Sequence, residues 1–108
     1  TGIGTSNGSE IVDAVLTSLN VKEYFDVVVT ACEVAHGKPE PDIYLEVAKR
    51  LGVKPEECLV FEDIPAGIMA GKAAGMPVIA VEDDFSKDLM DEKRALADAV
   101  IADYRELL

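Results

Sequence analysis

The stretch LVFEDIPAG, residues 59–67, places two adjacent carboxylates directly after three apolar residues. Leu59–Phe61 is typical of a buried strand, because β-branched and aromatic residues favour extended structure. The neighbouring carboxylates Glu62 and Asp63 repel each other and lose hydration at the rim of such a strand. They fit a site for a hard cation such as Mg²⁺, which binds oxygen ligands. The alternative is a helix cap, in which Asp63 accepts amide hydrogen bonds from a helix that begins near Pro65.

Short apolar runs alternate along the chain with segments of helical periodicity. The predicted strands are continuous apolar runs, at residues 2–5, 27–30, 59–61, 78–81 and 99–101. The predicted helices cover residues 9–19, 41–51, 65–74 and 86–97, and a last turn covers 104–108. Continuous apolar strands separated by helices predict an α/β fold, in which a parallel sheet carries helices on both faces.

Polar residues follow three of the predicted strands. Thr5 ends the first strand, the Gly37–Lys38 loop follows the second, and Glu62 and Asp63 follow the third. Ligands of open parallel sheets bind beyond the carboxyl ends of the strands. We therefore expect these three polar features to meet at one edge of the sheet.

Two of these segments fit an anion. Thr5–Gly8 (TSNG) offers hydroxyls and loop amides before the start of a helix, where anions bind favourably. Lys38 is followed by Pro39 in a stiff loop, where it can neutralise a phosphate or the nearby carboxylates. The alternative for Lys38 is a solvated loop lysine without a binding role.

The composition limits the classes of function. A chain of 108 residues is one small domain at most, and 21 acidic against 10 basic residues give a net charge of −11. This charge disfavours nucleic acid and anionic membranes, which are bound mainly through Lys and Arg. Two cysteines do not form a disulfide framework, and no apolar run has the length of a membrane span. We therefore expect a cytoplasmic protein with no nucleic-acid or membrane partner.

Three segments in this order resemble the haloacid dehalogenase superfamily of hydrolases. They are GIGTSN at 2–7, GKPEPDIY at 37–44 and VFEDIPAGIMAGKAAGMPVIAV at 60–81. The chain looks most like the β-phosphoglucomutase-like branch of phosphatases and phosphomutases. The resemblance implies a three-layer, Rossmann-like α/β fold. It also implies phosphoryl transfer on a small phosphorylated metabolite, a sugar phosphate above all, through an aspartyl-phosphate intermediate.

The resemblance also implies roles for particular residues. It assigns phosphate or substrate binding to Thr5, Ser6, Asn7 and Lys38. Thr5 and Lys38 match catalytic positions, at which they contact the transferring phosphoryl group. Asp63 matches the residue that binds the Mg²⁺ cofactor, and Glu62 is its partner, directly or through water.

One part of the superfamily's machinery has no match in this sequence. The nucleophile and its acid/base partner lie in an Asp-x-Asp motif after the first strand, and no Asp-x-Asp occurs among the 108 residues. The helical cap, which selects the substrate, is not matched either. The resemblance thus implies that residues 1–108 are the carboxyl-terminal portion of a core domain and are inactive alone. It places the unmatched strand between the strands at 2–5 and 59–61, which would each expose an edge.

Two functions follow from these observations. The first is that the chain forms part of a Mg²⁺-dependent phosphatase or phosphomutase. The alternative is a non-catalytic fragment, a binding or assembly module that self-associates through its exposed strands. Pairing with the missing amino-terminal segment would satisfy the same strand edges.

Overall fold

A computed structural model describes residues 1–82 and 87–107. In these residues five strands alternate with four α-helices in the predicted order. The strands are β1 (Gly2–Thr5), β2 (Val27–Thr30), β3 (Val60–Glu62), β4 (Val78–Val81) and β5 (Ala99–Ile101). The α-helices are α1 (Ser9–Ser18), α2 (Asp42–Leu51), α3 (Pro65–Ala73) and α4 (Met90–Leu96). Short 3-10 helices are η1 (Lys22–Tyr24), η2 (Ala31–Glu33), η3 (Pro55–Glu57), η4 (Lys87–Leu89) and η5 (Tyr104–Leu107). Ser86 and Leu108, which belong to the predicted last helix and last turn, lie outside the described residues.

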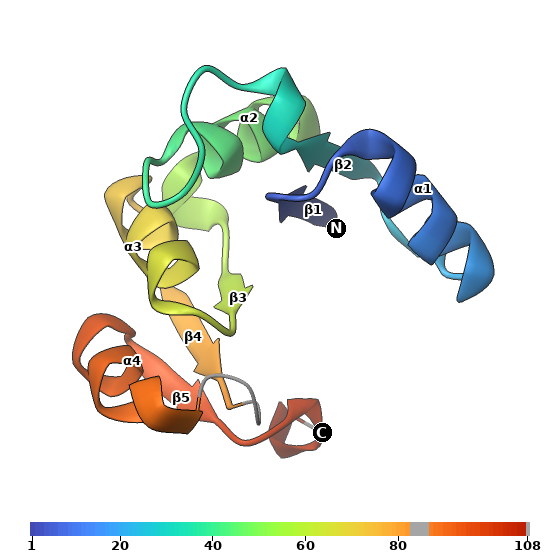
Figure 1. The fold of residues 1–108 in the computed structure, drawn as a ribbon. Helices are drawn as coiled ribbons and strands as arrows, with labels where there is room; N and C mark the ends of the chain where they lie inside the picture. The colour runs from blue at the N-terminus through green and yellow to red at the C-terminus, as the bar shows by residue number, and fades with distance from the viewer. Residues whose placement is uncertain (83–86, 108) are drawn as a thin grey trace.

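The strands pair in parallel, in two sheets. β1 pairs with β2, from Gly2 opposite Val27 to Thr5 opposite Thr30. β3 pairs with β4, and β4 pairs with β5. Within residues 1–82 and 87–107, no strand pairs with both β1 and β3, so the two sheets are separate. The strands follow an arc on which β1 and β3 are the facing ends of the two sheets (Figure 1). The interruption lies where the family resemblance predicted it.

Three helices cover one side of the strands. α2 packs on β1 and β2, α3 packs on β3 and β4, and α3 contacts both α2 and α4. The three helices follow the outside of the arc in Figure 1. Their contact with the strands forms one core, whose most completely buried members include Val29, Ile43, Ile68 and Val78. This shared core joins the two sheets even though their strands do not pair.

The other side of the strands is covered in part. Successive residues of a strand point to opposite faces, so Val28 faces away from the core that contains Val29. Val28 and Val12 of α1 line one shallow pocket, which places α1 on that opposite face. On β3, Phe61 packs against the ring of Tyr104, with ring centroids 5.4 Å apart. The predicted α/β architecture, with parallel strands between helices, is confirmed.

The helix α1 buries only part of its apolar surface. Val12 and Leu16 are buried, whereas Ile11, Val15 and Leu19 are 58%, 48% and 65% exposed. The apolar periodicity of this segment alone would favour burial of all five. The two-stranded sheet beneath α1 is narrow, so it covers a single stripe of the helix.

The bounds of β3 differ from expectation, whereas the cysteines form no disulfide, as expected. β3 begins at Val60 and includes Glu62, one residue later than the predicted strand, and Leu59 is 53% exposed. Both cysteines are free; Cys32 is exposed and Cys58 is half-buried. Among the residues that the structure describes, no helix has the length and apolar character needed to cross a membrane.

Candidate active site

A buried ion pair joins the two sheets at the carboxyl ends of their strands. The ammonium group of Lys38 donates a hydrogen bond to Oε1 of Glu62, the last residue of β3. The same Nζ donates to the carbonyl oxygen of Gly4 in β1, 3.2 Å away. The side chains of Lys38 and Glu62 are only 10% and 6% exposed. The structure therefore brings Lys38 and Glu62 together beside β1, as the sequence predicted.

The position of Glu62 is set by β3 and α3 together. Glu62 lies opposite Ala80 of β4, and its side chain turns inward beneath α3. A Cβ atom added at Gly67 of α3 would overlap the Glu62 carboxyl group, so only glycine leaves room there. A buried charge is costly unless donors satisfy it, and Glu62 has two of them. One is Lys38, and the other is Tyr44.

Tyr44 is a site residue that the sequence reasoning missed. Its hydroxyl donates to Oε1 of Glu62, and Nζ of Lys38 lies 5.1 Å from the centre of its ring. Burial, followed by the charge of Glu62, raises the pKa of Tyr44 well above its usual range, so the hydroxyl stays a donor. The segment PDIY placed this residue on the apolar stripe of a helix, and no sequence pattern indicated a partner 18 residues away.

The segment Thr5–Asn7 follows directly from the carbonyl that binds Lys38. Thr5 ends β1, and its Oγ1 accepts a hydrogen bond from the backbone N–H of Asn7, at 3.2 Å. The Thr5 hydroxyl proton therefore remains available for a ligand. Ser6 and Asn7 are exposed. This segment offers hydroxyl and amide groups one residue away from the Lys38 contact.

Asp63 lies at the same edge, but Asp63 is exposed whereas Glu62 is buried. The charge of Asp63 contributes to raising the pKa of Tyr104, after the larger effect of burial. The residue at the N-cap position of α3 is Ile64, which has no side-chain oxygen, and no side chain of the described residues caps the helix there. Asp63 therefore does not occupy the capping position that the alternative interpretation of the sequence gave it. Asp63 is thus a carboxylate that a cation from solvent can reach.

The carboxylates fit a magnesium ion in part. In residues 1–82 and 87–107, no three His, Cys, Asp or Glu side chains are arranged to hold a metal. Mg²⁺ in phosphate-transfer sites is commonly bound by one or two carboxylates, with waters and substrate phosphate as the other ligands. Asp63 fits one such ligand. Glu62 is buried, and Lys38 and Tyr44 both donate to its Oε1, so Glu62 is less suited than Asp63 to bind the ion directly.

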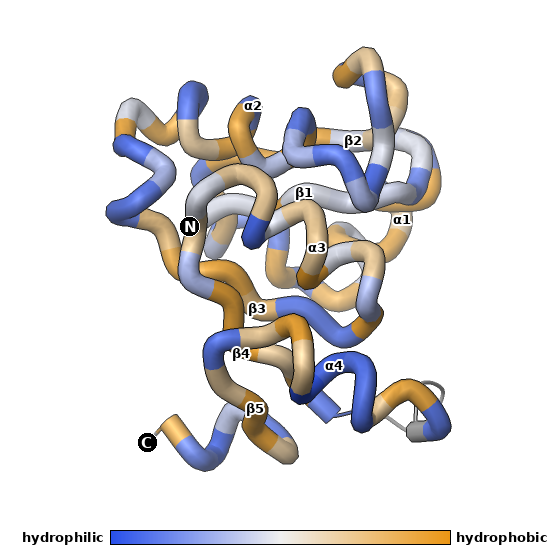
Figure 2. The backbone as a smooth tube through the Cα atoms, turned by 90° about the vertical axis from the view of Figure 1, so that its left-hand side faces the viewer, coloured by the Kyte–Doolittle hydropathy of each residue, from blue (hydrophilic) through white to orange (hydrophobic). Residues whose placement is uncertain are grey.

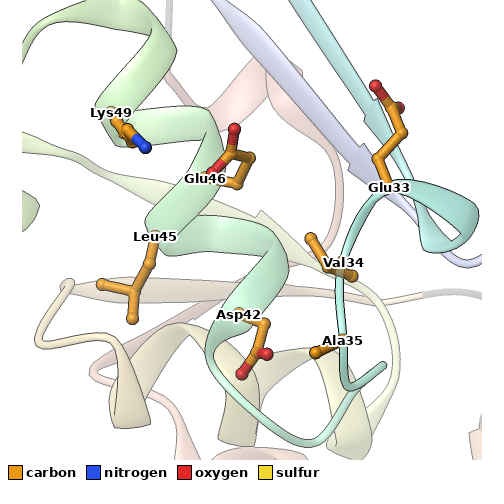
Figure 3. Close-up of a pocket in the computed structure, with 7 residues that line it drawn as sticks. All are labelled: Glu33, Val34, Ala35, Asp42, Leu45, Glu46 and Lys49. Carbon is orange, nitrogen blue, oxygen red and sulfur yellow. The ribbon is translucent and has the colours of Figure 1, made fainter.

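A separate pocket lies beside α2, away from these residues. It is lined by Asp42, Leu45, Glu46 and Lys49 of α2, with Glu33, Val34 and Ala35 opposite them (Figure 3). Three of the lining residues are acidic, so the pocket disfavours a phosphate group. None of the residues predicted for the site lines it.

The edge formed by β1 and β3 therefore combines groups suited to a phosphoryl ligand. A held ammonium group, a threonine hydroxyl and exposed backbone amides favour an anion, and an accessible carboxylate favours a cation. Along the backbone, the hydrophobic strand β3 is followed directly by a hydrophilic stretch at this edge (Figure 2). The apolar strand β3 thus carries a polar rim.

Known proteins share this sequence and fold. Residues 1–75 match the haloacid dehalogenase-like hydrolase family. The chain is 48% identical over 79 residues to the fructose-1-phosphate phosphatase YqaB of Escherichia coli, covering 73% of this chain and 42% of YqaB. A putative β-phosphoglucomutase from Thermotoga maritima superposes with a TM-score of 0.81 and 37% identity, over 93% of this chain and 46% of that structure. CbbY from Rhodobacter sphaeroides, solved in complex with phosphate, superposes with a TM-score of 0.87 and 30% identity, over 98% of this chain and 47% of CbbY.

The chain spans about half the length of the relatives it matches. The family match covers more than half of the chain, and it includes Thr5, Lys38, Glu62 and Asp63. The structural likeness extends over nearly all of it. The chain therefore belongs to the haloacid dehalogenase-like family of hydrolases.

Proposed function

We propose that this chain forms the phosphate-binding part of a phosphatase or phosphomutase that acts on a small phosphorylated metabolite, specifically a sugar phosphate. The observation that carries the proposal is the position of Lys38, held between the Gly4 carbonyl and Glu62 at the carboxyl edge of the strands. The names of relatives support the substrate class, since YqaB is a fructose-1-phosphate phosphatase.

In this proposal each polar group has one task. The Lys38 ammonium neutralises charge on the phosphoryl oxygens, and the Thr5 hydroxyl donates a hydrogen bond to one of them. Ser6 and Asn7 contribute further donors from the exposed turn. Glu62 keeps Lys38 in place. Asp63 would hold Mg²⁺, which when bound supplies positive charge next to the phosphoryl group.

The rest of the catalytic machinery is proposed to come from outside residues 1–108. The sequence holds no Asp-x-Asp motif to supply the nucleophile of an aspartyl-phosphate intermediate. The strand edges of β1 and β3 that face the interruption fit an additional strand between the two sheets. We propose that these residues are the carboxyl-terminal portion of a core domain, and that a nucleophile-bearing strand and a cap domain complete it. Free cysteines are consistent with the proposed cytoplasmic location.

The proposal is tested by joining this chain to the part of E. coli YqaB that it does not match, hereafter the joined polypeptide. The joined polypeptide is expected to hydrolyse p-nitrophenyl phosphate and fructose 1-phosphate in the presence of Mg²⁺ and to lose activity with EDTA. The 108-residue chain alone is expected to hydrolyse neither, because it contains no Asp-x-Asp motif to supply the nucleophile. Turnover by the chain alone, or a folded joined polypeptide without turnover, would contradict the proposal.

A second candidate is an assembly module without catalysis. The unpaired edges of β1 and β3 and the exposed side chains of Ile11, Val15 and Leu19 favour self-association. Light scattering separates the two candidates. A mass of at least twice 11.6 kDa that phosphate does not change would favour assembly. A mass of 11.6 kDa, together with saturable phosphate binding in a separate titration, would favour the first proposal.

A further inference from the structure

Tyr44 contacts both members of the buried pair and the strand beside them. It lies in the first turn of α2 and is 9% exposed. Its hydroxyl donates to Glu62, and its ring lies 5.1 Å from Nζ of Lys38, within the range of a cation–π interaction. One side chain thus touches the two charges that join the sheets.

The ring of Tyr44 is also fitted against β1. A Cβ atom added at Gly4 would lie 3.4 Å from Cε1 of Tyr44 and 3.3 Å from Cγ1 of Ile43. Glycine at this position lets the ring approach the backbone whose carbonyl accepts from Lys38. The ring therefore limits where the lysine ammonium can move, with β1 on one side and β3 on the other.

The hydroxyl of Tyr44 reduces the number of hydrogen bonds that Glu62 needs from Lys38. An ammonium group has three N–H donors. In this structure Gly4 and Glu62 each accept from Lys38, which leaves a third donor for a phosphoryl oxygen. Tyr44 shares Oε1 of Glu62 with Lys38, so the buried carboxylate does not depend on the lysine alone.

We propose that Tyr44 is a positioning residue that acts through Glu62 to hold Lys38 with one donor directed to the phosphate. Tyr44 does not itself contact the ligand. The identity of the ligand rests on the proposed function, whereas the effect of Tyr44 on Lys38 can be measured without it.

The first experiment follows the Lys38 ammonium group directly, in the 108-residue chain. Exchange of its hydrogens with water is measured by ¹⁵N NMR at low temperature. Y44F keeps the ring and removes one donor, so exchange is expected to become about threefold to tenfold faster, the change that follows from losing one hydrogen bond. The matched control is Y24F, because Tyr24 is 66% exposed and lies outside the site. An unchanged Lys38 exchange rate in Y44F would overturn the proposal.

A conservative variant guards against misfolding. If Y44F does not fold, p-aminophenylalanine is placed at position 44, where it keeps the ring and an N–H donor. Slow exchange of the Lys38 ammonium in that variant is the expected result. Exchange as fast as that of the exposed Lys49 would overturn the proposal.

The second experiment asks whether Tyr44 acts through Glu62. The dissociation constant for inorganic phosphate is expected to rise about threefold to tenfold in Y44F, because Lys38 is held less well. In an E62Q background the same substitution is expected to change the constant little, since the acceptor charge is gone. An equal effect in both backgrounds would overturn the proposal. Absence of phosphate binding in the unsubstituted chain would count against the proposed function. The exchange rates of the Lys38 ammonium group would still test whether Tyr44 positions Lys38.

Discussion

Replacing Lys38 by Met is expected to lower hydrolysis of p-nitrophenyl phosphate by the joined polypeptide about 10²-fold to 10³-fold, the usual cost of one lost electrostatic contact to a transition state. Methionine has a similar length and no charge, so it removes the donor that faces the phosphoryl site. The ammonium group is fixed by the Gly4 carbonyl oxygen and the Glu62 carboxylate. The measurement is kcat/KM at saturating Mg²⁺.

The same substitution is expected to weaken the fold, because it leaves Glu62 buried with Tyr44 as its remaining donor. Removing one partner of a buried ion pair typically costs about 3–5 kcal/mol. The double variant K38M/E62Q separates the two effects, since it removes the uncompensated charge. It is expected to recover much of the stability in urea unfolding but none of the activity. K49M, on the exposed face of α2, is the matched control and is expected to retain full activity. A K38M enzyme with nearly normal kcat/KM would show that Lys38 has no part in the reaction.

Replacing Gly67 by Ala is expected to disrupt the site from the other side of Glu62. The added Cβ would overlap the Glu62 carboxyl group, which Lys38 and Tyr44 hold in place. The carboxylate must move and give up those hydrogen bonds, or α3 must shift outward. Overpacking of this kind costs about 1–3 kcal/mol. We expect a loss of stability of that size in urea unfolding, together with weaker phosphate binding.

Two comparisons make this prediction specific. G8A is the control for the loss of stability alone, because a Cβ at Gly8 meets nothing within 4 Å but Gly8 belongs to the segment predicted to bind the anion. E62A removes the group that the new methyl would strike, so G67A is expected to cost little in an E62A background. If G67A destabilises the protein equally with and without Glu62, the clash is with α3 packing alone, and our account of how Glu62 is positioned is wrong.

The sequence was sufficient to predict which segments meet. Thr5 ends one predicted strand, whereas Lys38 and Glu62 come after two others. Because parallel strands end at one edge, the approach of these segments follows from topology. The contact of Lys38 with both Gly4 and Glu62 confirms that expectation. The interruption between β1 and β3 also followed from the sequence, through the family whose motifs it carries.

The direction of individual side chains could not be predicted in the same way. Neighbouring residues of an extended chain point to opposite sides, but nothing in the pair Glu62–Asp63 indicates which one turns inward. The small residue Gly67, on a helix that packs over β3, decides that Glu62 does. The role of the Tyr44 hydroxyl depends on the same packing. Helical periodicity predicts that Tyr44 lies on the apolar side of its helix, and its ring does lie in the core, but periodicity cannot identify a hydrogen-bond partner on a strand.

Binding of inorganic phosphate to the 108-residue chain tests the central claim most directly. The protein carries a net charge of −11, so unspecific binding of phosphate is disfavoured. In an NMR titration against chloride at equal ionic strength, we predict saturable shifts of the backbone amides of Thr5, Ser6, Asn7 and Lys38, which K38M abolishes. A titration with no saturable shift at these residues, or with equal shifts in K38M, would contradict the assignment of this edge as a phosphate site.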